Sequence, residues 1–301
     1  MKKPLAIVIT GPTASGKSAL AVSLAKALNT EIISADSRQI YKGIPIVTAV
    51  PTQEEREGIT HHLIEKLNLE DYYNASMFEQ DSLRILGNIF AEKEVAIVCG
   101  GSMLYVDALT EGIDDIPTVP ENIRSSLMAE WKEKGDAWLL SQLALLDPIH
   151  FDKVDRKNMK RVFHAVEVSM TAQAPYSSLL LQKKPERDFD ILKIVLDGDR
   201  QFLFDKINNR VLNMMEQGLE EEARNVYPFR QLNSLNTVGL KEMFDYFDGK
   251  TDRQTAIARI QKNTRVYAKK QTTWHKRDKK AMRLNFHSPL SDNVSNILKM
   301  I

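Results

Sequence analysis

The chain has 301 residues, of which 43% are hydrophobic, and its formal net charge is only +1. A chain of this length can bury a large core in one or two domains, and its near-neutral balance means that any nucleic-acid binding must come from local clusters of charge. A single cysteine, Cys99, excludes an internal disulfide, and no stretch reaches the roughly 20 apolar residues that span a bilayer, so we expect a cytoplasmic protein without a membrane segment.

The first element is an apolar run at residues 5–9, which leads into the glycine-rich loop GPTASGKS and then into a helical pattern at residues 19–28. The loop fits the G-x-x-x-x-G-K-[ST] pattern, whose backbone N–H groups surround linked phosphates at a helix N-terminus. Lys17 adds a positive charge, and Ser18 is placed to bind a Mg²⁺ ion carried by the phosphates. The phosphate-binding candidates are Gly11, Pro12, Thr13, Ala14, Ser15, Gly16, Lys17 and Ser18.

Two further short apolar runs, at residues 31–34 and 95–99, alternate with helical patterns and predict a parallel, doubly wound sheet. Asp36 lies two residues after the run at residues 31–34, and the ends of parallel strands line the ligand crevice of such sheets. A turn cap is an equally good interpretation of Asp36. The second run ends in Gly100-Gly101-Ser102 and lacks the strand-end aspartate of ATP-hydrolysing P-loop proteins. The adjacent His61 and His62 lack zinc-site spacing, and we interpret them as structural.

The segment GIDDIPTVP, which begins at residue 112, predicts a domain boundary, and helical patterns follow at residues 121–134, 138–146 and 156–170. No strand pattern returns until residues 189–196. We therefore predict an α/β, P-loop NTPase-like core domain, a parallel sheet flanked by helices, formed by residues 1–115 and 188–301. An all-helical insertion domain would comprise residues 116–187.

The rest of the chain is mostly helical, and we expect a last long helix to begin near Thr255 and to include the basic stretch at residues 256–283. That stretch holds ten Lys and Arg residues against the single acid Asp278, with Tyr267, Trp274 and His275 interleaved. Basic and aromatic side chains together suit a phosphate backbone and unstacked bases. A solvated helix face is the alternative.

The chain resembles the tRNA dimethylallyltransferases, also called tRNA isopentenyltransferases, over nearly its whole length. The segments that carry the resemblance are GPTASGKS, DSRQIYKG, HHLIE, GGSMLY, RKNMKRVFHAVEV, DRQFLFDKINNRVLNMMEQGLEEEA, TVGLKEMFDYFDG and TRVYAKKQTTW. The resemblance implies transfer of a dimethylallyl group from dimethylallyl pyrophosphate to the exocyclic amine of the adenosine 3′-adjacent to the anticodon, with release of pyrophosphate. The implied partner is a tRNA anticodon stem-loop, for which we expect a monomeric protein that uses Mg²⁺.

The resemblance also implies roles for individual residues. Asp36 is the general base that accepts the proton of the amine, and Ser102 contacts the transferring centre. Arg210 joins the GPTASGKS loop in holding the pyrophosphate, with an exposed helix arginine as the alternative. The implied tRNA-binding residues are Asp36, Ser37, Arg38, Gln39, Ser102, Arg124, Lys160, Arg161, Val162, Phe163 and His164.

The chain departs from the family pattern at five positions, Val47, Val50, Ser102, His164 and Leu240, where the family has glycine, lysine, threonine, arginine and tyrosine. Two alternatives stay open. A prenyltransferase of the same build that acts on free adenine nucleotides would not need the helical insertion or the basic last helix. A tRNA-binding paralogue that has lost activity is supported only by the departures. A small-molecule P-loop kinase explains the GPTASGKS loop but not GGSMLY or the ordered match beyond it.

Overall fold

The computed structural model describes residues 3–114, 116–180 and 185–301, which divide into two compact units. Unit 1 comprises Met1–Thr110 and Glu186–Ile301, and unit 2 comprises Glu111–Pro185. Their limits differ by a few residues from those of the expected core and insertion domains.

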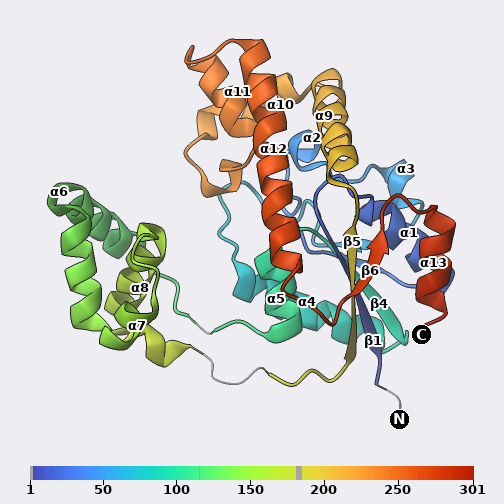
Figure 1. Cartoon of the computed structure of the whole chain (residues 1–301), viewed down its shortest axis with the longest axis horizontal. Coiled ribbons are helices and arrows are strands. Elements are labelled where there is room, and N and C mark those ends of the chain that lie inside the picture. The colour runs from blue at the N-terminus through green and yellow to red at the C-terminus, as the bar shows by residue number, and fades with distance from the viewer. Residues whose placement is uncertain (1–2, 115, 181–184) are drawn as a thin grey trace. The chain divides into compact units, whose positions relative to one another are not determined.

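Unit 1 is built on a six-stranded sheet in the order β3-β2-β4-β1-β5-β6, in which every neighbouring pair is parallel (Figure 1). The strands are β1 (Leu5–Thr10), β2 (Ile32–Ser34), β3 (His61–His62), β4 (Val95–Cys99), β5 (Asp190–Asp197) and β6 (Met282–Asn285). The central strands are apolar and buried, as a parallel sheet covered on both faces requires. The predicted α/β class is therefore confirmed.

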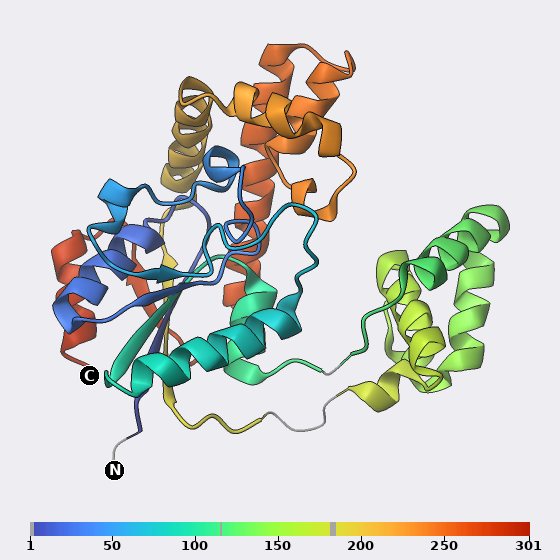
Figure 2. The same ribbon diagram turned by 180° about the vertical axis from the view of Figure 1, so that it is seen from behind.

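Helices cover both faces of this sheet (Figures 1 and 2). On one face lie α1 (Lys17–Leu28) and α13 (Leu290–Leu298), and on the other lie α4 (Ala75–Phe90) and α5 (Met103–Glu111). Residues Ile7, Ile9, Leu24 and Ile97 belong to the apolar core between sheet and helices. None of the helices in the described ranges combines the length and the apolar character that crossing a membrane requires.

The last long helix, α12, spans Arg253–His275 and packs against α9 (Arg200–Glu216) and α11 (Leu240–Phe247). The short helices α2 (Pro45–Thr48), α3 (Gln53–Arg56) and α10 (Leu219–Val226) complete unit 1, with 3-10 turns at Tyr227–Phe229 and Asn233–Leu235.

The expectation that one helix carries the whole basic stretch to residue 283 is wrong. The chain turns after Lys276, where Asp278 Oδ1 accepts hydrogen bonds from the backbone N–H groups of Lys280 and Ala281. The chain then enters the edge strand β6, which pairs with β5. Half of the ten basic residues therefore lie outside the helix.

Unit 2 is a small helical domain with its own apolar core. It contains α6 (Glu121–Leu146), α7 (Pro148–Lys153), α8 (Met159–Ala172) and a 3-10 turn at Tyr176–Leu179. Gly135, at φ 81°, interrupts α6 between the two helical segments expected there. The core residues include Leu127, Leu139, Leu143, Val162 and Phe163.

Candidate active site

The GPTASGKS loop connects the end of β1 to the start of α1. Gly11 has a φ of 148°, and a side chain there would come within 2.7 Å of the Leu196 carbonyl oxygen, so the loop needs glycine at this position. Gly16 is in the left-handed region at φ 87° and starts α1 without a side-chain cap. The first N–H groups of α1 therefore remain available for an anion, and the helix dipole favours one.

The hydroxyl groups of Ser15 and Ser18, both in this loop, have no partner among the described residues. The Ser15 hydroxyl is buried, and burying an unpaired hydroxyl is costly unless something else bonds to it. Ser18 is exposed at the start of α1, and its hydroxyl forms no hydrogen bond with any residue that the structure describes. Both observations fit a loop shaped around a polyanionic ligand.

Two cations, Lys17 and Arg210, lie near the loop without an ion-pair partner in the described part of the chain. The Lys17 Nζ atom donates to the Pro12 carbonyl oxygen (2.7 Å). Burial lowers the pKa of Lys17 to about 8, although the nearby Cys99 and Asp36 oppose this shift. Burial also lowers the pKa of Arg210, again opposed by Asp36. A bound anion of high charge would pair with both cations and offset the cost of burying them.

Asp36 and Ser102 lie at the same edge of the sheet because β2 and β4 are parallel neighbours whose last residues, Ser34 and Cys99, are paired. The Asp36 Oδ1 atom accepts hydrogen bonds from the backbone N–H groups of Arg38 (2.9 Å) and Gln39 (3.3 Å). Asp36 is therefore a turn cap, and its Oδ2 atom has no bond among the described residues. Capping and acid–base chemistry are compatible in one carboxylate.

The Ser102 hydroxyl accepts a hydrogen bond from the Ser37 backbone N–H (2.8 Å) and donates one to Ser37 Oγ (3.2 Å). A side chain at Gly100 would come within 2.1 Å of the Ala35 carbonyl oxygen. The Gly100-Gly101 turn thus lets the strand ends approach closely enough for Ser102 to hold the loop that follows Asp36.

The side chains of Arg38 and Gln39 are engaged within unit 1. Arg38 donates to the carbonyl oxygens of Asn233 (2.9 Å), Ser234 (3.2 Å) and Asn236 (3.3 Å). Gln39 accepts a hydrogen bond from the Ser34 hydroxyl (3.0 Å) and donates to two carbonyl oxygens of the α2 region. Both residues therefore fix loops around Asp36.

The C-terminal half of α12 approaches the same site with residues spaced by four positions. Gln271 is bonded both to the GPTASGKS loop and to the Gly100-Gly101 turn. One turn later, His275 Nε2 lies 3.2 Å from Thr10 Oγ1, and burial together with the Lys193 and Lys17 charges lowers the pKa of His275 to about 4. One turn earlier, burial and the Asp36 charge raise the pKa of Tyr267 to about 12. The sequence pattern gives no signal for these contacts beyond the presence of Gln271 in KKQTTW.

A small cavity of about 20 Å³ lies beside the GPTASGKS loop. It is lined by Ser18, Ala21, Ile32, Ser34, Gln39, Pro51, His61, Ile64 and Cys99. Burial raises the pKa of the Cys99 thiol to about 11, so it is a neutral, largely apolar wall.

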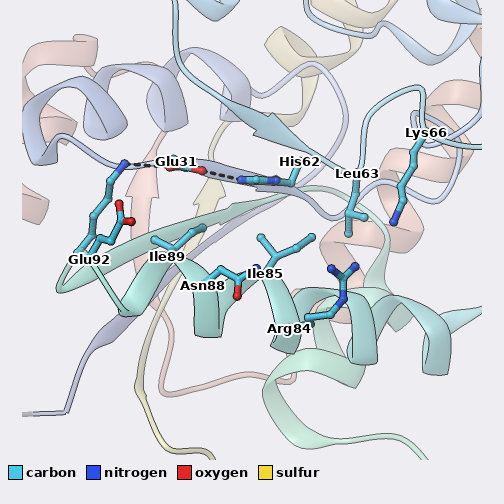
Figure 3. A pocket seen from close by; sticks show the side chains of 10 residues that line it. Glu31, His62, Leu63, Lys66, Arg84, Ile85, Asn88, Ile89 and Glu92 are labelled. Carbon is cyan, nitrogen blue, oxygen red and sulfur yellow. Dashed lines mark hydrogen bonds and ion pairs between the residues drawn. The ribbon is translucent and has the colours of Figure 1, made fainter.

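A larger pocket of about 450 Å³ lies elsewhere in unit 1, against α4 (Figure 3). Glu31 accepts hydrogen bonds from Lys93 Nζ (3.0 Å) and lies 2.7 Å from His62 Nε2. At Asp81, Lys66 (3.3 Å) and Arg84 (2.9 Å) share one carboxylate. The described residues contain no group of three or more His, Cys, Asp and Glu side chains arranged to hold a metal ion.

Within unit 2, Glu167 is a buried carboxylate that holds two residues of the expected tRNA-binding set. Arg124 donates to it through Nε (2.9 Å) and Nη2 (2.6 Å), and His164 Nδ1 lies 3.0 Å away. Val162 and Phe163 are buried, and their side chains pack in the apolar core of unit 2. Lys160 and Arg161 are exposed on α8.

The parallel sheet and the glycine-rich loop that joins β1 to α1 define a P-loop-type protein. The family model for IPP transferase matches residues 39–278, and the chain belongs to this family.

Similar proteins carry related names. The chain is 48% identical to tRNA dimethylallyltransferase 2 of Parabacteroides distasonis over 272 residues, which cover 90% of this chain and 91% of that protein. A solved structure of the tRNA isopentenylpyrophosphate transferase of Bacillus halodurans has a TM-score of 0.73 and 32% identity, covering 99% of this chain and 95% of that one. A solved structure of a eukaryotic dimethylallyltransferase acting on tRNA has a TM-score of 0.82 and 25% identity, and the match covers 99% of this chain and 77% of that one.

Proposed function

We propose that this protein transfers the dimethylallyl group of dimethylallyl pyrophosphate to the exocyclic amine of the adenosine 3′-adjacent to the anticodon of tRNA. The observation that carries the proposal is that a loop with unpartnered phosphate-binding groups and a carboxylate lie at one edge of the sheet. Close relatives named tRNA dimethylallyltransferase and the ordered family match support it. We also propose that the protein acts as a monomer in the cytoplasm.

The chemistry is a displacement at C1 of the donor. The adenine amine forms the new C–N bond, the C1–O bond breaks, and its electron pair leaves with the pyrophosphate. The amine is a poor nucleophile because its lone pair is delocalised, so a base that accepts its proton assists the step. Asp36 is that base, through the oxygen that does not cap the turn. Ser102 orients the amine through its place beside Ser37.

The leaving pyrophosphate is stabilised by the GPTASGKS loop, Lys17 and Arg210. Fixed donors aimed at developing negative charge lower the barrier because they need no reorganisation during the reaction. The unpartnered hydroxyl of Ser18 fits Mg²⁺, which prefers oxygen ligands and keeps water and phosphate oxygens as its others. Bound there, Mg²⁺ would neutralise charge on the pyrophosphate.

The nucleic-acid partner reaches the site as a single-stranded loop, because a target base inside a stack must be swung out before chemistry. We propose that Asp36, Ser37 and Ser102 contact the target nucleotide in unit 1. In unit 2, the domain we propose for tRNA contact, the exposed Lys160 and Arg161 bind phosphates. Arg124 and His164 join them from the Glu167 cluster.

The test mixes Mg²⁺ and labelled dimethylallyl pyrophosphate with either an anticodon stem-loop or AMP. We expect label in the stem-loop only, and a loss of about 10²- to 10⁴-fold in turnover for Asp36→Asn, because the amide keeps the cap but cannot accept the proton. Asp252→Asn, which alters the capping aspartate of α12, is the matched control. Label in AMP alone would identify a free-nucleotide enzyme, and RNA binding without transfer would identify an inactive paralogue.

A further inference from the structure

Gln271 links the two halves of the proposed active site. The Thr13 backbone N–H, in the GPTASGKS loop, donates to Gln271 Oε1 (2.9 Å). The Gln271 Nε2 atom donates to the Gly101 carbonyl oxygen (2.8 Å), one residue before Ser102. A single amide therefore joins the loop that receives the donor to the turn that carries Ser102.

The surroundings make this bridge specific. Gln271 is only 2% exposed, so neither of its partners has water as a ready substitute. A side chain at Gly101 would come within 2.4 Å of Gln271 Nε2, so the missing side chain at this position is what lets the amide reach the turn. A buried amide whose donor and acceptor are both used fixes one geometry, since no other arrangement satisfies both partners.

We propose that Gln271 is a positioning residue that holds the pyrophosphate-binding loop and the Ser102 turn in register, so that donor and target amine meet at the correct distance. The inference rests on the proposed function. A small misplacement of reacting groups costs far more rate than stability, because the gain from orientation is lost with distance. Loss of Gln271 should therefore lower the rate of the bound complex more than it lowers folding.

The first experiment compares Gln271→Met, which has similar volume but no amide, with the native protein in single turnovers at saturating donor and stem-loop. We expect a rate about 10- to 100-fold below native, with stem-loop affinity unchanged and the thermal midpoint lowered by a few degrees at most. Gln261→Met is the matched control, because Gln261 lies on the same helix and donates to Asn208 O (3.2 Å), away from both loops. We expect its rate to stay within twofold of native.

The second experiment uses Gln271→Glu. The ionised carboxylate accepts from Thr13 N–H but repels the Gly101 carbonyl oxygen, whereas the protonated acid restores both bonds. Burial at this position and the facing Gly101 carbonyl oxygen raise the pKa of the introduced carboxyl, so the rate of Gln271→Glu relative to native should rise several-fold as the pH falls from 8.5 to 6. Dividing by the native rate at each pH removes the pH dependence that the two proteins share.

Two outcomes would overturn the positioning role: a Gln271→Met protein with the native rate and native KM values, or a Gln271→Glu to native ratio that is constant with pH. Failure of the proposed function is distinguishable, because it appears as absence of transfer by the native protein itself. In that event, binding of pyrophosphate by the native and Gln271→Met proteins still tests the bridge. Weaker binding by the variant is expected, and equal binding would contradict it.

Discussion

Two regions of unit 1, the larger pocket beside α4 and the GPTASGKS loop, differ in whether their charged side chains have ion-pair partners. In the larger pocket beside α4, Glu31 pairs with His62 and Lys93 (Figure 3). Lys66 and Arg84, which also line this pocket, both pair with Asp81. At the GPTASGKS loop, Lys17 and Arg210 have no such partner in the described residues, and the Ser15 hydroxyl is buried and unbonded.

The difference indicates that polar groups without hydrogen-bond or ion-pair partners mark a ligand-binding site better than the volume of a pocket does. A pocket whose ions neutralise one another offers little to a charged ligand, because binding would first have to break existing pairs. A loop with free N–H groups and unpaired cations binds an anion without that cost. We therefore expect substitutions at the loop to affect the reaction and substitutions at the larger pocket to affect only stability.

The sharpest contrast is between Lys17→Met and Lys93→Met. Lys17 lies at the loop, whereas Lys93 is paired with Glu31. Removing Lys17 takes away a charge that stabilises the leaving pyrophosphate, and we expect kcat/KM for the donor to fall about 10²- to 10³-fold. Lys93→Met should retain native kinetics. Steady-state kinetics at varied donor concentration measure kcat/KM for the two variants. Equal losses of kcat/KM in the two variants would show that the paired and the unpaired lysine do not differ in function.

A second contrast tests Arg210. Burial without a partner holds its pKa below the ordinary value, which a bound pyrophosphate would reverse. Arg210→Gln should raise the donor KM about 10- to 150-fold, since one charge-assisted hydrogen bond contributes roughly 1.5–3 kcal/mol. Arg84→Gln, at the larger pocket, is the control and should leave the donor KM unchanged. An unaltered KM in Arg210→Gln would mean that this arginine does not contact the donor.

The parts of the site that are local in sequence were predictable. The GPTASGKS loop is contiguous and flanked by a strand and a helix, and Asp36 follows a parallel strand whose end must lie at the same sheet edge. What a pattern cannot give is which distant residue satisfies a buried polar group. Gln271 meets the loop from 258 positions away, and Arg38 bonds to carbonyl groups around Ser234.

The elements that escaped prediction are short and weakly patterned. Strand β3 is two histidines, His61–His62, and β6 is Met282–Asn285 at the other edge of the sheet, so neither shows an apolar run. Charged residues at an edge are typical of strands that must not pair with other chains. In β6, Arg283 instead binds Asp197 (3.2 Å) of the neighbouring strand, a contact that exists only after folding.

The pH dependence of donor binding sharpens the comparison further. Burial holds the pKa of Lys17 at about 8 in the free protein, and a bound anion raises it again. Binding therefore takes up a proton above pH 8, and affinity for dimethylallyl pyrophosphate should fall several-fold between pH 7.5 and 9. Calorimetry in buffers of different ionisation enthalpy measures this uptake. Lys17→Arg, which stays charged, is the control and should show no such fall.

The smallest effect is expected at the larger pocket itself, in Glu31→Gln. The hydrogen bond with His62, together with Lys93, lowers the pKa of Glu31, and Glu31 is about a quarter exposed. A carboxylate with a lowered folded-state pKa stabilises the protein above its unfolded pKa, and this contribution disappears as the pH falls through the folded value. Glu31→Gln should therefore lose about 1 kcal/mol of unfolding free energy at pH 7. The gap from native should narrow below a pH of about 4.5.

Urea unfolding at pH 7 and pH 4 measures this gap, and transfer assays at pH 7 should show native turnover for Glu31→Gln. Glu92→Gln is the matched control: Glu92 lines the same pocket, but its carboxylate forms no hydrogen bond or ion pair with the described residues, so its replacement should change neither the stability nor the turnover. A loss of turnover in Glu31→Gln with stability intact would mean that the larger pocket takes part in the reaction. The pairing of charged side chains would then not distinguish a structural pocket from a functional one in this protein.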